Sequence, residues 1–212
     1  ALRTALAALP ISGERLDPDC EVRVTAGPQP QVVEEAMDVS QGKLALGFRT
    51  GGVTCWEEDY PALTMFNAIF GGTTLSKLFM NVREKLSLCY YASSLYHRQK
   101  GLITVSSGIE FQNYQRAYDE IMAQLEAVQK GELEDWELEG ARSTLLNSYA
   151  TVGDSQGKLE NFYLGQAATG QHETPADLAR AIQDMTAERI CRAMSTVKLD
   201  TVYFLKGKEA EA

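Results

Sequence analysis

Patterns typical of β-strands gather in the first half of this chain, helix patterns fill the second half, and one strand pattern returns at the end. Apolar residues alternate with small or polar ones over residues 43–48, which predicts a strand with one buried face. Further strands are predicted over residues 32–37, 89–97, 102–109 and 201–206. This order favours an α+β fold, with an antiparallel-rich sheet and helices packed on one face.

Two of these strand patterns are close neighbours in the sequence. Residues 32–37 and 43–48 flank Ser40-Gln41-Gly42, which is typical of a turn. Because neighbouring strands joined by a short turn commonly pair with each other, we expect a β-hairpin over residues 32–50.

Helical patterns account for most of the remaining chain. Leu63, Phe66 and Phe70 line one face of a first helix, which Gly71-Gly72 ends. Thr174 precedes Pro175 and Asp177 in a pattern that caps a helix start. The other helices are predicted over residues 75–85, 114–130, 132–151, 155–169 and 187–196.

Proline and glycine oppose regular structure in residues 26–31. We therefore expect residues 1–31 to be an upstream segment and linker, residues 32–208 to form a single domain, and residues 209–212 to be a tail. The start of the chain has no initiator Met and is a poor secretory signal, which favours a cut inside a longer reading frame.

Charge, the length of apolar runs and cysteine content limit the expected partners and the expected cellular location. The chain has 20 basic and 29 acidic residues, a net charge of −9, which opposes a broad nucleic-acid interface. No apolar run approaches the roughly 20 residues that span a bilayer, so no membrane contact is expected. The four cysteines lie far apart, which favours reduced thiols and a cytoplasmic location.

Metal and nucleophile signals are weak. The two histidines, His97 and His172, are not spaced to share a zinc ion on one helix face, so we expect no metal site in this chain. Cys89 lies near Arg83, but no histidine is close enough in sequence to act as its base, and a structural cysteine is the better interpretation. Gly71-Gly72-Thr73-Thr74 is expected to be a turn between helices.

The most informative segment is residues 71–91. Arg83 near a predicted helix end presents a guanidinium, and Tyr90 at a predicted strand start presents a phenol. If the two converge, they suit a peptide carbonyl or a developing oxyanion. On the residues alone, an ordinary solvated helix end is the alternative.

This segment resembles the C-terminal half of the insulinase/pitrilysin family of zinc metallopeptidases, which includes the mitochondrial processing peptidase. The family's stretch has Gly-Gly, then Ser-Arg-Leu-Phe, then Arg-Glu-Lys-x-Gly-Leu-Ala-Tyr. The matching residues are Gly71-Gly72, Ser76-Lys77-Leu78-Phe79 and Arg83-Glu84-Lys85-Leu86-Ser87-Leu88-Cys89-Tyr90. The likeness covers about residues 32–206, with Lys77, Ser87 and Cys89 in place of the usual Arg, Gly and Ala.

The resemblance implies a processing-peptidase-like fold and different roles for the two halves of the peptidase. Zinc would be bound in the N-terminal half or in a partner subunit, and this half would close over a peptide or protein substrate. Arg83 would hold a substrate carbonyl and Tyr90 would stabilise the oxyanion, so the chain has no catalytic zinc chemistry of its own and would be inert alone. Two alternatives stay open: a catalytically inactive structural partner subunit, and an unrelated α+β domain that binds a small molecule.

Overall fold

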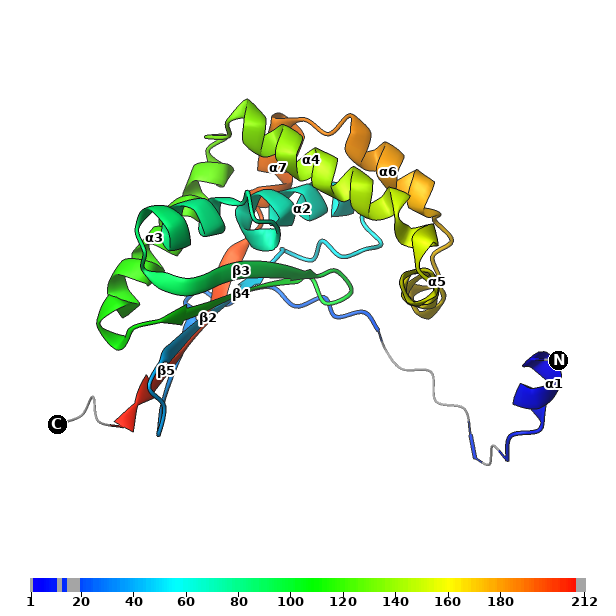
Figure 1. Ribbon diagram of the computed structural model, residues 1–212, viewed down its shortest axis with the longest axis horizontal. Coiled ribbons are helices and arrows are strands. Elements are labelled where there is room, and N and C mark those ends of the chain that lie inside the picture. The colour runs from blue at the N-terminus through cyan, green and yellow to red at the C-terminus, as the bar shows by residue number, and fades with distance from the viewer. Residues whose placement is uncertain (1, 11–12, 15–19, 209–212) are drawn as a thin grey trace.

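A five-stranded sheet forms one layer of the protein and helices form the other, as seen in a computed structural model that describes residues 2–10, 13–14 and 20–208 (Figure 1). The strands are β1 (Gln31–Met37), β2 (Gly42–Arg49), β3 (Cys89–His97), β4 (Leu102–Ile109) and β5 (Lys198–Gly207). Their order in the sheet is β1-β5-β2-β4-β3. Among the described residues only the β1–β5 pair is parallel, so the predicted antiparallel-rich sheet is confirmed.

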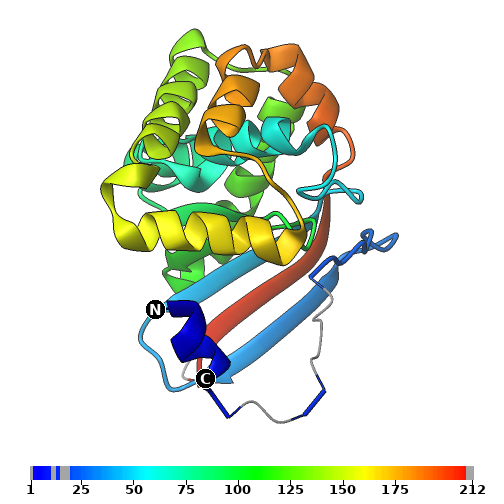
Figure 2. The same ribbon diagram turned by 90° about the vertical axis from the view of Figure 1, so that its right-hand side faces the viewer.

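The hairpin expected over residues 32–50 is wrong. β5 lies between β1 and β2, and Tyr203 is aligned with Val33 on one side and with Ala45 on the other (Figure 2). Burial explains the order, because Val202 and Phe204 of β5 are 2% and 7% exposed, whereas Val33 of β1 is 44% exposed. Placing the more apolar strand inside the sheet removes more apolar surface from water.

The helices lie mainly on one face of this sheet, as predicted (Figure 1). The α-helices are α1 (Leu2–Ala7), α2 (Tyr60–Asn67), α3 (Tyr114–Gln129), α4 (Asp135–Ala150), α5 (Gln156–Thr169), α6 (Pro175–Gln183) and α7 (Ala187–Met194). Short 3₁₀ turns cover η3 (Phe111–Asn113) and η4 (Val152–Asp154). Thr174 caps α6 as predicted, and its backbone N–H donates to the Asp177 carboxylate at 2.8 Å.

The core lies between the sheet and this helical layer. Leu44, Leu46 and Phe48 of β2 are almost completely buried, which confirms the buried face predicted from their alternation. Phe70 stacks on Phe66 with ring centroids 5.1 Å apart and meets the Phe48 ring edge-on at 6.4 Å. These aromatic contacts join the central strand to α2 and the segment that follows it.

Two segments expected to be α-helical have the wider π-helical geometry. They are η1 (Ala68–Gly72) and η2 (Leu78–Lys85), on either side of the turn at residues 73–77. At the end of η2, the Leu86 N–H donates to the Asn81 carbonyl oxygen, five residues back, at 3.1 Å. π-Helical turns are rare and frequently occur at functional sites.

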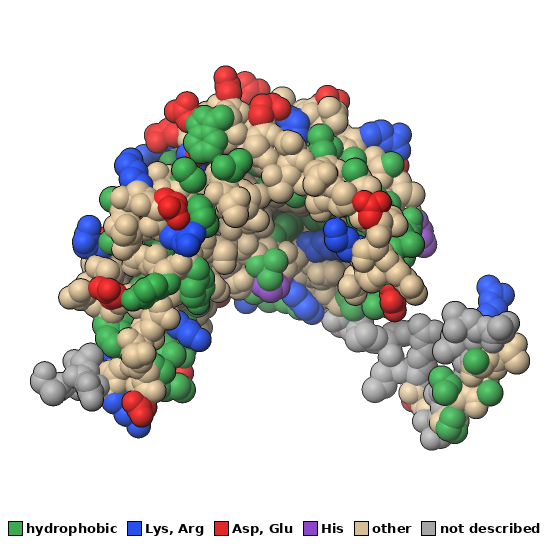
Figure 3. Space-filling model, in the orientation of Figure 1, with side chains coloured by type: hydrophobic (Ala, Val, Ile, Leu, Met, Phe, Trp, Pro, Cys, Tyr) green, Lys and Arg blue, Asp and Glu red, His purple; other side chains and the backbone are tan. Residues whose placement is uncertain are grey.

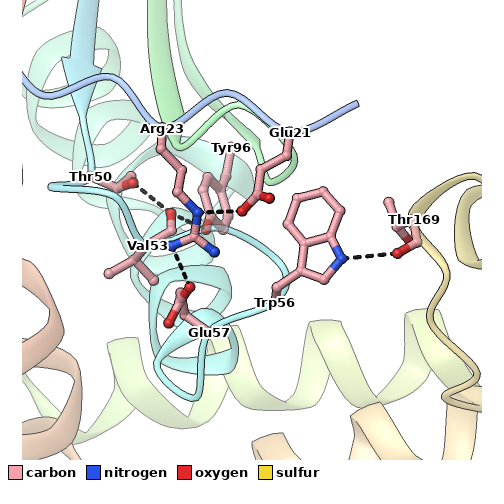
Figure 4. A network of polar contacts seen from close by, with 8 residues as sticks. All are labelled: Glu21, Arg23, Thr50, Val53, Trp56, Glu57, Tyr96 and Thr169. Carbon is pink, nitrogen blue, oxygen red and sulfur yellow. Dashed lines mark hydrogen bonds and ion pairs between the residues drawn. The ribbon is translucent and has the colours of Figure 1, made fainter. Parts of the chain in front are cut away.

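Val22 and Arg23 contact the body of the domain, although they lie in the predicted upstream segment. The Val22 N–H donates to the carbonyl oxygen of Gln99, and Arg23 forms ion pairs with Glu21 and Glu57 (Figure 4). The boundary at residue 32 stays a prediction, and these contacts begin ten residues before it.

Candidate functional site

Tyr90 occupies an irregular position at the start of β3, which is an edge strand. Cys89 is aligned with Ile109 and Tyr91 with Gly108, so Tyr90 is the extra residue of a β-bulge. A bulge redirects a side chain and leaves its residue outside the ladder. The Tyr90 side chain is 60% exposed as a result.

Arg83 lies beside this bulge, one π-helical segment earlier in the chain. Its Nε atom donates a hydrogen bond to the Tyr90 carbonyl oxygen at 3.0 Å, and its Nη1 atom lies 3.1 Å from a carboxylate oxygen of Glu84. The guanidinium also lies over the Phe79 ring, 4.6 Å from its centroid. Among the described residues, no group accepts a hydrogen bond from Nη2, so these contacts orient the guanidinium and leave donors for a ligand.

Two cavities meet at this pair. One, of about 420 Å³, is lined by Arg83, Tyr90 and the end of η2 together with Glu110 and Asn113. The other, of about 400 Å³, is also lined by Arg83 and Tyr90 and extends past residues 71–74 along β3. The sequence-predicted site residues are therefore brought together on an accessible surface.

The link between η2 and β3 depends on an unusual backbone conformation. Ser87 has φ of +50°, the one positive φ of a non-glycine residue in the described ranges. The Ser87 N–H donates to the Arg83 carbonyl oxygen and the Leu88 N–H to that of Val82, which ends the helix in a left-handed turn. The family's usual glycine suits this geometry better than serine does.

Comparison with known proteins identifies the family. A family model described as "Peptidase M16 inactive domain" matches residues 6–145. The chain belongs to this family. The resemblance seen in residues 71–91 is thereby confirmed.

Two proteins of Bacillus subtilis (strain 168) are similar to this M16 inactive domain. The "Probable inactive metalloprotease YmfF" is 42% identical over 182 residues, which cover 85% of this chain and 42% of that protein. The "Uncharacterized zinc protease YmxG" is 23% identical over 156 residues, or 72% of this chain and 38% of that protein. The chain thus spans about two fifths of the length of these curated relatives.

Solved structures share the fold. A conserved protein from Enterococcus faecalis V583 matches with a TM-score of 0.85 and 30% identity, over 98% of this chain and 49% of that one. A peptidase M16 inactive domain from Pseudomonas fluorescens matches with a TM-score of 0.73 and 18% identity, over 85% of this chain and 44% of that one. At that lower identity the match concerns the fold alone.

The described residues of this M16 domain do not fit a zinc ion. In residues 2–10, 13–14 and 20–208, no three His, Cys, Asp or Glu side chains are grouped to hold a metal. His97 instead forms a hydrogen bond with the Thr104 hydroxyl at 3.0 Å. None of the helices in these ranges has the length and apolar character to cross a bilayer.

Cys89 does not have the surroundings of a nucleophile. Burial raises the pKa of its thiol above the ordinary value, and the neighbouring Arg83 only partly opposes this effect. His97 lies at the opposite end of β3 and cannot act as its base. A protonated thiol without a base is poorly reactive, which favours a structural role for Cys89.

Proposed function

We propose that this chain is the substrate-binding half of a two-part zinc-dependent peptidase, and that it closes over a peptide held at a zinc site in the other half. The observation that carries the proposal is the Tyr90 bulge with the Arg83 guanidinium fixed on its carbonyl oxygen. A structural helix end needs neither an exposed phenol nor an oriented guanidinium between two cavities.

The two side chains have different roles in this proposal. Arg83 uses the donors left on its guanidinium to hold a backbone carbonyl of the substrate. Tyr90 donates its phenolic hydrogen to the oxyanion that develops as the peptide bond is attacked. Both groups act as hydrogen-bond donors, so the proposed roles require neither side chain to gain or lose a proton.

The other half is proposed to supply zinc, because the described residues here do not fit the metal. The family description, an inactive domain, is consistent with a half that has no zinc chemistry of its own. The similar proteins are also about twice as long as this chain, which leaves room for an N-terminal zinc-bearing half. A separate partner subunit is the other possible source.

A second candidate function is a structural partner subunit without any hydrolysis. It is favoured by the relative named as a probable inactive metalloprotease, and by Ser87 at a position that suits glycine. Hydrolysis by the complete assembly distinguishes the two functions.

The test compares Tyr90→Phe with Tyr163→Phe in the full-length, zinc-loaded assembly. Tyr163 is the matched control, because it is an exposed tyrosine on α5 and lines neither of the two cavities beside Arg83. We expect Tyr90→Phe to lower the turnover of a peptide about 10²–10³-fold, and Tyr163→Phe to change it little. Arg83→Ala is expected to raise KM as well. Unchanged peptide hydrolysis in both Tyr90→Phe and Arg83→Ala would favour the structural partner subunit. The same conclusion would follow if the wild-type assembly did not hydrolyse peptides.

We also propose a cytoplasmic location. All four cysteines, Cys20, Cys55, Cys89 and Cys191, are free thiols, as is usual in a reducing compartment. Partners other than the peptide substrate and the zinc-bearing half, such as nucleic acid or a membrane, are not part of the proposal.

A further inference from the structure

A third cavity lies at the other end of β3, next to Arg98. It has a volume of about 300 Å³ and is formed by α2, η1, the end of β3 and α4. Of the described residues that line it, Arg98 is the one with a charged side chain, and the hydroxyls of Thr64, Thr144 and Ser148 add polar groups. A local positive charge of this kind is notable in a chain with a net charge of −9.

Arg98 is held in place by Tyr60. Its Nη1 atom donates to the Tyr60 hydroxyl at 3.0 Å, and its guanidinium lies 5.9 Å from the centroid of the Tyr60 ring. Among the described residues, no carboxylate lies within ion-pair distance of Arg98. Arg23, Arg49, Arg83, Arg142, Arg180 and Arg189 each have an acidic partner. Arg116 and Arg192 share with Arg98 the lack of one among the described residues, but neither lines this cavity.

The surrounding elements fix the position of Arg98. The Cys55 N–H donates to the Arg98 carbonyl oxygen at 2.9 Å. The Tyr96 hydroxyl of β3 donates to the Val53 carbonyl oxygen, and the Trp56 indole N–H donates to the Thr169 carbonyl oxygen, so the loop of residues 53–56 is joined to β3 and to α5 (Figure 4). On the α5 side, a Cβ atom on Gly165 would lie 3.0 Å from Nη2 of Arg98, so a glycine leaves room for the guanidinium. Basic side chains are visible inside the hollow between the β3–β4 turn and α5 (Figure 3).

The cavity is adjacent to the candidate site. Gly72 and Thr73 line both this cavity and the 400 Å³ cavity beside Arg83. The strand from Tyr90 to Arg98 extends over roughly 26 Å at about 3.3 Å per residue. An extended peptide can lie along such an unpaired strand edge and place side chains in the cavities beside it.

We infer that the cavity beside Arg98 binds a carboxylate group of a peptide that lies along β3. A guanidinium with free donors matches a carboxylate in charge and in its planar geometry. Removal of the carboxylate from much of the bulk water strengthens the attraction. The peptide rests on the proposed function, whereas the carboxylate site rests on Arg98 and its surroundings.

The test measures direct binding of synthetic decapeptides to the full chain, without hydrolysis, by calorimetry at low salt. One peptide has a single internal Glu and an amidated C-terminus, a second has Gln at that position, and a third has Gln and a free C-terminal carboxylate. We expect the Glu peptide or the free-carboxylate peptide to bind about 10-fold to 100-fold more tightly than the uncharged peptide. Which of the two binds tightly identifies the source of the carboxylate.

Matched variants locate the binding. Arg98→Gln is expected to remove this preference, while Lys100→Gln, which removes the same charge from the same turn outside the cavity, is expected to keep it. Ser148 is an exposed residue of α4 that lines the cavity. Ser148→Glu would place a carboxylate of the protein in the cavity, in competition with the carboxylate of the peptide, and is expected to abolish the preference. Ser143→Glu adds the same charge to the same helix outside the cavity and serves as its control.

Ser148→Glu also covers the case in which Arg98→Gln does not fold, because residue 148 is exposed on its helix. Equal binding of all three peptides to the wild-type chain overturns the inference. The inference is also overturned if Arg98→Gln and Ser148→Glu change the preference for a carboxylate no more than their controls do. The proposed function has a separate readout, since Tyr90→Phe affects hydrolysis by the assembly whether or not the Arg98 cavity binds a carboxylate.

Discussion

Lys77 and Glu137 form an ion pair inside the protein, with the Lys77 Nζ atom 2.9 Å from Oε2 of Glu137. Their side chains are only 9% and 5% exposed. Oε2 of Glu137 also accepts the backbone N–H of Glu134 at 3.0 Å, which caps the start of α4. The pair therefore joins the residue just before η2 to α4, and η2 carries Arg83 at its end.

Lys77→Met is expected to destabilise the protein by about 3–5 kcal/mol, because it leaves the Glu137 carboxylate buried without its cation. Urea unfolding at neutral pH measures the change. Lys77→Arg restores the residue usual in the family and is expected to retain most of the stability. A loss below about 1 kcal/mol in Lys77→Met would mean that water reaches the carboxylate.

Ser87→Gly is expected to stabilise the protein by about 1 kcal/mol, because glycine adopts the observed φ of +50° without the steric cost that a Cβ atom brings. For a chain of this length the melting temperature should rise by about 2–4 °C. Ser93→Gly is the control, since Ser93 lies in extended β3 and glycine there should destabilise by about 0.5–1 kcal/mol. A fall in melting temperature for Ser87→Gly would contradict the account of this turn.

Gly71→Ala is expected to destabilise the protein by about 1–3 kcal/mol. A Cβ atom at residue 71 would lie 2.6 Å from the backbone nitrogen of Ser94, so η1 and β3 would have to separate. Gly153→Ala is the matched control, because its Cβ atom would have nothing within 4 Å and should change stability by less than about 0.5 kcal/mol. Equal melting temperatures for the two variants would show that η1 moves without cost.

Local patterns predicted those parts of the structure that depend on neighbouring residues. The alternation in β2, the Thr174 cap and the helix end at Gly71-Gly72 are set within a few residues, and each is readable in the sequence. The family motif also predicts that Arg83 and Tyr90 lie close together, and the Arg83 Nε atom donates to the Tyr90 carbonyl oxygen. The β-bulge at Tyr90 has no local signal, because it arises from the alignment of β3 with β4.

The remaining differences between the sequence predictions and the structure arise from contacts between residues that are far apart in the sequence. The position of β5 depends on which of two distant strands buries more apolar surface, and the π-helical geometry of η1 and η2 has no recognisable residue pattern. The cavity beside Arg98 was missed for the same reason. Its walls come from α2, η1, β3 and α4, and an arginine without an acidic partner can be recognised only when all its neighbours are known.

The place of β5 in the sheet also determines when the protein can finish folding during its synthesis. β2, β3 and β4 can pair with one another early, but β1 has no partner in the described sheet until β5, Lys198–Gly207, has been made. Some 160 residues separate the two strands in the sequence, and such distant pairings form slowly. A nascent chain would therefore expose one edge of β2 until residues 198–207 have emerged from the ribosome, and a chaperone that covers this edge would act in that interval.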